Sequence, residues 1–156
     1  MRIIKYISLF IILGGWSVML SNAQEAGTKA RLAHSHWECL LYLDFAGSEE
    51  TYRNYREKHF LAGIKHVREM MAELKKYGDK NNKNWSKTAP TFFNWHLSGP
   101  NEDFVAGRLF QATYQNAVEG LYRESSIEYP LPEDLEFIAS NKYRSSNCNI
   151  IALSGE

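Results

Sequence analysis

Apolar side chains recur at three- and four-residue intervals over most of the chain, which is the spacing of one face of an α-helix. The longest such stripe covers residues 49–77, and shorter ones cover residues 28–45, 102–124 and 133–144. Sustained alternation of apolar and polar residues, which would indicate a β-strand, does not occur in the sequence. The pattern therefore predicts an all-α protein, a single-domain helical bundle of about four helices.

Residues 79–100 interrupt the helical pattern with a polar run that becomes aromatic in its second half, at Trp85, Phe93 and Trp95. A connection of this length in a compact domain is typically functional. We therefore predict a long loop here, and two roles for its aromatic side chains are open. The segment folds back over the bundle and closes its core, or, as the alternative, it is a loop exposed to solvent that presents these side chains to a partner. A short apolar tail, residues 150–153, follows the last predicted helix.

The first 23 residues have the pattern of a secretory signal peptide. Arg2 and Lys5 form a basic start, an apolar run follows over residues 7–19, and Ala23 places a small residue at the cleavage position. We predict cleavage after residue 23, a domain over residues 24–156, and export to the periplasm or the extracellular space of a bacterium. The alternative is a retained membrane anchor, although the apolar run is shorter than the roughly 20 residues that cross a bilayer.

Composition and charge restrict the kinds of molecule that this chain is expected to bind. The chain has 18 basic and 18 acidic residues, and two of the basic ones lie in the predicted signal peptide. A chain without net positive charge has no broad attraction for nucleic acid or for anionic membranes. Its 9 Tyr, 8 Phe and 4 Trp form a rich aromatic set, and aromatic side chains are favoured anchors of protein interfaces. We therefore expect another envelope or secreted protein as the partner, no nucleic acid, and no membrane span after signal cleavage.

The two cysteines, Cys39 and Cys148, both lie in the part of the chain predicted to be exported. Because an isolated pair in an oxidising compartment most often forms a structural disulfide, we predict one disulfide that closes the bundle. The alternative is a free reactive thiol at Cys39. The sequence has no C-x-x-C motif, so a thioredoxin-like redox role has no support.

Histidine side chains can serve as metal ligands or as catalytic groups. His34 and Glu38 lie four residues apart on a predicted helix and could share a metal ion, but a zinc site needs three or four ligands and no compact cluster completes the pair. His59 and His66 share a face of the second helix, without a nucleophile at a defined spacing. We therefore expect no metal, no cofactor and no catalytic residue.

A polar corner precedes the predicted third helix, where a Gly99-Pro100 turn is followed by Asp103 and Arg108. Asp103 is suited to cap the helix, and Arg108 is suited to pair with Asp103 or to bind an acidic partner. With the aromatic residues of the predicted loop, this corner gives five candidate partner-binding residues: Trp85, Phe93, Trp95, Asp103 and Arg108.

Three motifs are distributed over nearly the whole of the predicted mature chain: Trp37-Glu38-Cys39, then Gly99-Pro100-x-x-Asp103-Phe104-x-x-Gly107-Arg108, and then Tyr143-x-x-x-Asn147-Cys148. In these motifs the chain resembles small exported helical proteins of bacteria whose function is uncharacterised. The resemblance implies a helical fold and pairing of the cysteines, and it implies no particular activity.

These features predict a small secreted or periplasmic, non-catalytic protein-binding domain. The most specific version of this hypothesis is an immunity protein that neutralises a toxin, or an enzyme inhibitor. The first alternative is a small periplasmic hydrolase that uses a metal ion or the histidines. The second alternative is a structural or stress-related envelope protein without a single binding site.

Overall fold

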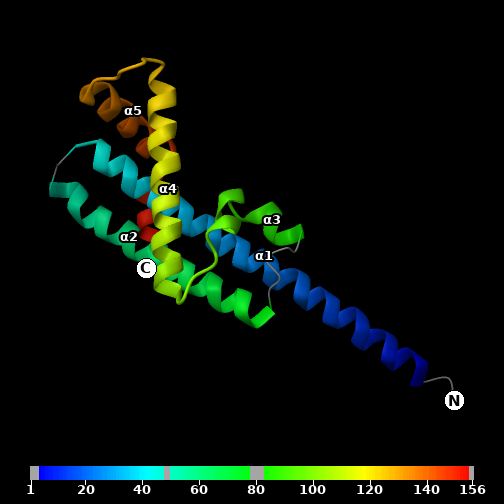
Figure 1. Ribbon diagram of the computed structural model, residues 1–156. Helices are drawn as coiled ribbons and strands as arrows, with labels where there is room; N and C mark the ends of the chain where they lie inside the picture. The colour runs from blue at the N-terminus through cyan, green and yellow to red at the C-terminus, as the bar shows by residue number, and fades with distance from the viewer. Residues whose placement is uncertain (1–3, 48–49, 78–82, 155–156) are drawn as a thin grey trace.

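The computed structural model describes residues 4–47, 50–77 and 83–154, with side chains described over residues 24–47, 53–76 and 84–153. Within these ranges the chain forms helices and no strands, so the predicted all-α fold is confirmed (Figure 1). The elements, in order, are α1 (Ile4–Phe45), α2 (Glu50–Tyr77), α3 (Lys83–Thr88), the 3₁₀ helix η1 (Thr91–Trp95), α4 (Glu102–Ser125), α5 (Pro132–Ser145) and α6 (Cys148–Ser154).

The four helices predicted from the apolar stripes correspond to part of α1 and to α2, α4 and α5. Residue 49, the expected start of the second helix, lies outside the described residues. The first helix begins at Ile4 and not near residue 28, because the helix continues without a break through most of the predicted signal peptide. This N-terminal part of α1, dark blue in Figure 1, projects away from the other helices. None of the helices, over the residues described, combines the length and the apolar character needed to cross a membrane.

The segment between α2 and α4 is not the long loop that we predicted. It forms α3 and η1, and it packs over the first core cluster through Trp85 and Phe93, both fully buried. The indole Nε1 of Trp85 donates a hydrogen bond of 2.5 Å to Oδ1 of Asn94, which joins the two short helices. Of the two roles left open, the one in which this segment folds back and closes the core is therefore correct. The apolar tail is also helical, as α6.

The core is built around the long contact between α1 and α2, and α4 crosses this pair near its own N-terminal end (Figure 1). A first cluster, which includes Trp37, Met70 and Leu109, lies beneath α3 and η1. A second cluster, which includes Leu41 and Leu121, lies where α1, α4, α5 and α6 meet. Helix α1 contributes to both clusters and is therefore the central element of the fold.

The predicted disulfide between Cys39 and Cys148 is confirmed, so the alternative of a free thiol at Cys39 is wrong. The two Cα atoms are 5.5 Å apart across a sequence separation of 109 residues. Both cysteines are buried in the second core cluster. The bond ties the C-terminal part of α1 to the start of α6 and closes the bundle, as expected.

Candidate functional site

The three aromatic residues proposed to bind a partner do not lie together on the surface. Trp85 and Phe93 are both 0% exposed, so their side chains support the core and cannot contact a partner directly. Trp95 is 71% exposed at the end of η1. Of the aromatic candidates, only Trp95 is therefore placed to contact another molecule.

Asp103 and Arg108 have separate local roles at the start of α4. The helix is capped by Asn101, whose Oδ1 accepts a hydrogen bond of 2.8 Å from the backbone N–H of Phe104. Asp103, expected as the cap, instead accepts from Arg68 of α2 at 2.9 Å. Arg108 does not pair with Asp103. It donates to the carbonyl of Ser98 at 2.8 Å and lies over the ring of Phe104.

The proximity expected for His34 and Glu38 is present, since Nδ1 of His34 lies 3.2 Å from Oε2 of Glu38. The ring of His34 also packs against Phe92 and Phe93. Among the described side chains, no group of three or more histidine, cysteine or acidic residues is arranged to hold a metal ion. The pair is therefore best described as a local contact within α1.

A groove lies between α2 and α4, above α1, and we call it the α2–α4 groove. It has a volume of 260 Å³. The residues that line it are Trp37, Phe60, Ile64, Arg68, Asp103, Ala106, Gly107 and Phe110. Of the five candidate partner-binding residues predicted from the sequence, it includes Asp103 and none of the other four. The spacing of Phe60 and Ile64 on α2, and of Ala106 and Phe110 on α4, placed each pair on one face, but only the crossing of the two helices joins the pairs.

The α2–α4 groove is aromatic inside and charged at its mouth. The rings of Phe60 and Phe110 meet edge to face with centroids 5.5 Å apart, and Trp37 also packs against Phe110. The exposed ion pair between Arg68 and Asp103 borders the apolar interior. An apolar pocket with a few charged groups at its edge has the usual composition of a site that receives an apolar anchor.

Gly107 keeps one wall of the α2–α4 groove open. A Cβ atom built at this position would meet no atom within 4 Å. Phe104 lies one helical turn before Gly107 and is 49% exposed, and Arg108 follows directly after Gly107. The exposed side chain of Phe104 therefore extends the apolar surface beyond the groove.

Beside the groove, three histidines form a buried cluster between α1 and α2, which we call the histidine cluster. His36 is 1% exposed, His59 is 0% exposed and His66 is 8% exposed. Nδ1 of His36 lies 3.1 Å from Nδ1 of His59, and the ring centroids of His36 and His66 are 5.5 Å apart. The sequence placed His59 and His66 on one face of α2. It did not indicate that His36 of α1 completes the cluster.

Burial keeps His36 and His59 neutral. It lowers the pKa of His36 to about 4, assisted by repulsion from His59 and His66, and it lowers the pKa of His59 to about 4. A neutral histidine with a free nitrogen can act as a base. However, the cluster lines neither the α2–α4 groove nor the hollow on α5, so neither of them gives a substrate access to these rings.

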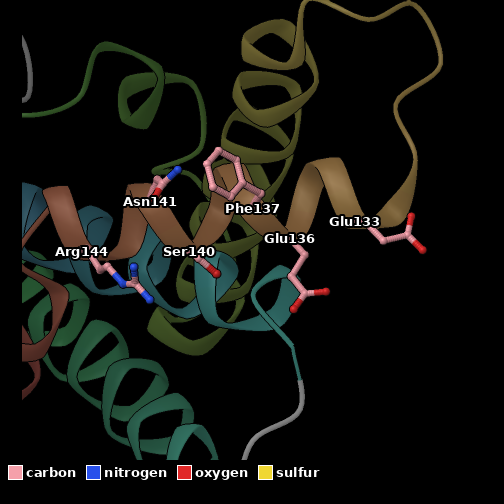
Figure 2. Close-up of a pocket in the computed structure, with 6 residues that line it drawn as sticks. All are labelled: Glu133, Glu136, Phe137, Ser140, Asn141 and Arg144. Atoms are coloured by element: carbon pink, nitrogen blue, oxygen red, sulfur yellow. The ribbon is translucent and has the colours of Figure 1, made fainter.

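A second hollow lies on the exposed face of α5, and Figure 2 shows the six residues that line it, which are Glu133, Glu136, Phe137, Ser140, Asn141 and Arg144. All six come from this one helix. The ring of Phe137 and the carboxylates of Glu133 and Glu136 point to different sides of the helix and do not converge on one point (Figure 2). We therefore regard the α2–α4 groove, which has walls from three helices, as the better candidate site.

Comparisons of the chain with protein-family models, with curated proteins and with solved structures find no match. The class of the protein is therefore defined by its own structure. It is an all-α protein with one disulfide, an aromatic groove between two helices and a buried histidine cluster next to that groove.

Proposed function

We propose that this chain is an exported, non-catalytic protein-binding domain whose α2–α4 groove receives an apolar side chain of a partner protein. The observation that carries the proposal is the groove itself. Aromatic side chains line it, a charged pair borders it, and Gly107 keeps one wall open. Pockets that bury one aromatic or aliphatic anchor supply most of the affinity in many protein complexes.

The lining of the groove indicates the chemistry of the partner. Phe60 and Phe110 offer ring edges and faces to an aliphatic or aromatic side chain. Arg68 and Asp103 are both well exposed, so they can form ion pairs with charged residues on either side of that anchor. We therefore expect the partner to present one large apolar side chain between charged neighbours. A toxin or an enzyme that is blocked by this chain is the most specific form of the proposal.

Trp95 belongs to the same proposed surface. Its backbone carbonyl accepts from Arg108, which also lies over the ring of Phe104. The backbone of Trp95 is thereby held near the first turns of α4, where Phe104 and Gly107 also lie, and its indole is exposed. We expect Trp95 to contribute area at the edge of the interface, with the centre of the interface at the groove.

Export is supported by three observations. The N-terminal residues have the composition of a signal peptide. The disulfide between Cys39 and Cys148 is of the kind that persists in oxidising compartments. The N-terminal part of α1 projects from the other helices (Figure 1), and the core residues that α1 contributes from Ala26 onward lie beyond the predicted cleavage position.

The proposal is tested by site-specific photo-crosslinking in the host envelope. A photoreactive phenylalanine derivative replaces Phe60, which is 39% exposed at the groove, and in a matched control it replaces Phe137, which is 69% exposed on α5. We expect one protein to be crosslinked from position 60 and not from position 137. Crosslinking of the same protein from both positions, or from 137 alone, would contradict the groove as the site.

A further inference from the structure

The histidine cluster and the α2–α4 groove share the same contact between α1 and α2. On α1, His36 directly precedes Trp37, which forms part of the groove. On α2, His59 directly precedes Phe60, whose carbonyl accepts from the indole Nε1 of Trp37 at 3.4 Å. A change in the spacing of α1 and α2 at the cluster therefore changes the shape of the groove.

The contact within the cluster depends on neutral rings. A neutral histidine has one N–H and one bare nitrogen, so a single hydrogen can lie between the two Nδ1 atoms of His36 and His59. The Nε2 atoms of both rings are buried and have no hydrogen-bond partner among the described groups. If both rings were protonated, two N–H groups and two positive charges would face each other across 3.1 Å.

The groups around His36 and His59 do not neutralise the positive charge that protonation of both rings would create. From α2, the ring of His66 packs against His36, and Nδ1 of His66 lies 3.2 Å from Oε2 of Glu69. Glu69 is in turn held by Lys29 of α1 at 2.8 Å. From α5, the ring of Tyr143 meets His59 edge-on, with centroids 6.3 Å apart. The carboxylate of Glu69 is thus already shared by His66 and Lys29.

The disulfide restrains α1 and does not restrain α2 directly. Cys39 lies three residues after His36 and ties α1 covalently to α6. Helix α2 has no such bond over its described residues and is held by packing, hydrogen bonds and ion pairs. Repulsion within the cluster is therefore relieved by displacement of α2 from α1.

We propose that the histidine cluster is an acid-sensitive latch, which holds α2 against α1 at neutral pH and releases a bound protein from the α2–α4 groove when the compartment becomes acidic. This inference rests on the proposed function for the identity of the groove's occupant. The movement of α2 with pH is a property of the chain alone.

The direction of the effect follows from the burial of the rings. Because the pKa values of His36 and His59 are lowered from 6.5 to about 4, protons bind the opened form before they bind the closed form as the pH falls. The equilibrium between the closed and opened forms of the α1–α2 contact is therefore unaffected above about pH 6.5. The opened form is favoured progressively as the pH falls from 6.5 to 4. At pH 5, each histidine that becomes solvated on opening favours the open form by about 30-fold.

Hydrogen exchange on the disulfide-bonded, exported protein tests the latch without a partner. Protection of the amides of residues 60–70 is measured from pH 7 to pH 4.5, after correction for the intrinsic exchange rates. We expect protection there to fall at least tenfold, with a smaller change at residues 109–121 of α4. The double substitution His36→Gln and His59→Gln should abolish this pH dependence, and His34→Gln, on the same helix but outside the cluster, should preserve it. Constant protection, or an equal loss in the double variant, would overturn the latch.

If the double variant does not fold, a pH titration of the unsubstituted protein followed by NMR tests the same coupling. The indole N–H of Trp37 should shift together with the ring signals of His36 and His59 as they titrate. Titration of the rings without a change at Trp37 would overturn the coupling to the groove.

Two outcomes distinguish failure of the latch from failure of the proposed function. A protein that crosslinks to position 60 equally well at pH 7 and pH 5 would contradict the latch and leave the groove as a binding site. Loss of protection at acidic pH, without any protein crosslinked from position 60, would contradict the binding function and leave the latch.

Discussion

At the level of single residues, the contact between Gly63 and Trp37 sets the distance between α1 and α2. A Cβ atom built at Gly63 would overlap the indole ring of Trp37. Trp37 is 1% exposed and also packs against Phe110, so a shift of the indole would disturb that ring contact. Glycine at this position therefore permits the close approach of the two helices on which both the groove and the histidine cluster depend.

Substitution of Gly63 by alanine should therefore destabilise the protein, although alanine has the higher helix propensity. We expect a loss of about 1–3 kcal/mol in the free energy of unfolding, because overpacking a core contact outweighs the propensity gain. Urea denaturation measures this difference. Gly120→Ala on α4, where a Cβ meets no atom within 4 Å, is the control and should be neutral or stabilising. Equal stability of the two variants would show that Trp37 can move aside.

The buried histidines also predict how stability changes with pH. Since the pKa values of His36 and His59 are lower in the folded chain than in the unfolded chain, the unfolded state binds more protons as the pH falls from 6.5 to 4. The free energy of unfolding should fall between pH 7 and pH 5 by about 2 kcal/mol for each of the two histidines, or about 4 kcal/mol in all. Thermal denaturation at a series of pH values measures it. A stability that does not change over this interval would contradict burial of the neutral rings.

The sequence predicted part of the histidine cluster. Helical periodicity placed His59 and His66 on one face of α2. It could not show that His36 faces α2, because that depends on the register between two helices. Register is set by close contacts such as Gly63 against Trp37, which no local spacing encodes.

At the level of elements, the four long amphipathic helices were predictable, whereas α3, η1 and α6 were not. The long helices carry an apolar stripe over many turns, which is a strong periodic signal. Helix α3 has six residues and η1 has five, too few to form a stable helix in isolation. They are stabilised by burial of Trp85 and Phe93 against the long helices, and an aromatic-rich segment gives the same sequence signal whether it covers the core or faces solvent.

Two tryptophans of this segment give a matched test of that interpretation. Trp85→Ala should cost about 3–5 kcal/mol of stability, because it removes a fully buried indole and its hydrogen bond to Asn94. Trp95→Ala should change stability by less than about 0.5 kcal/mol, because its indole is 71% exposed. Chemical denaturation of both variants measures these two changes in the free energy of unfolding. Similar losses for the two would contradict the division into a core residue and a surface residue.

At the level of the whole molecule, the disulfide joins parts of the chain that are far apart in sequence. It was predictable from the two cysteines together with the signal-like N-terminus, because compartment decides the state of a cysteine pair. The bond fixes α1 to α6 and leaves α2 held by non-covalent contacts. This asymmetry is the reason that we assign movement at acidic pH to α2.

Removal of the disulfide should therefore weaken the whole fold. The double substitution Cys39→Ala and Cys148→Ala should lower the free energy of unfolding by roughly 2–5 kcal/mol, since it releases a loop of 109 residues in the unfolded chain. Denaturation with and without reductant gives the comparison. The unsubstituted protein in reductant should approach the double variant, and a reductant-dependent loss that persists in the double variant would contradict this explanation.

The α2–α4 groove is the feature on which the proposed function depends, and α4 offers a matched pair of positions to test it. Gly107 lies in the groove and Gly120 lies outside it, and at both positions a Cβ atom would meet nothing within 4 Å. Leucine at either position makes the same change in helix propensity. Only leucine at position 107 extends into the space proposed for the partner.

The most direct measurement is the affinity of the crosslinked partner, once purified, for the unsubstituted chain, for Gly107→Leu and for Gly120→Leu at neutral pH. Occlusion of the groove should weaken binding at least tenfold in Gly107→Leu, which corresponds to about 1.4 kcal/mol. Gly120→Leu should bind as tightly as the unsubstituted chain. Equal affinity of all three proteins would contradict the groove as the binding site.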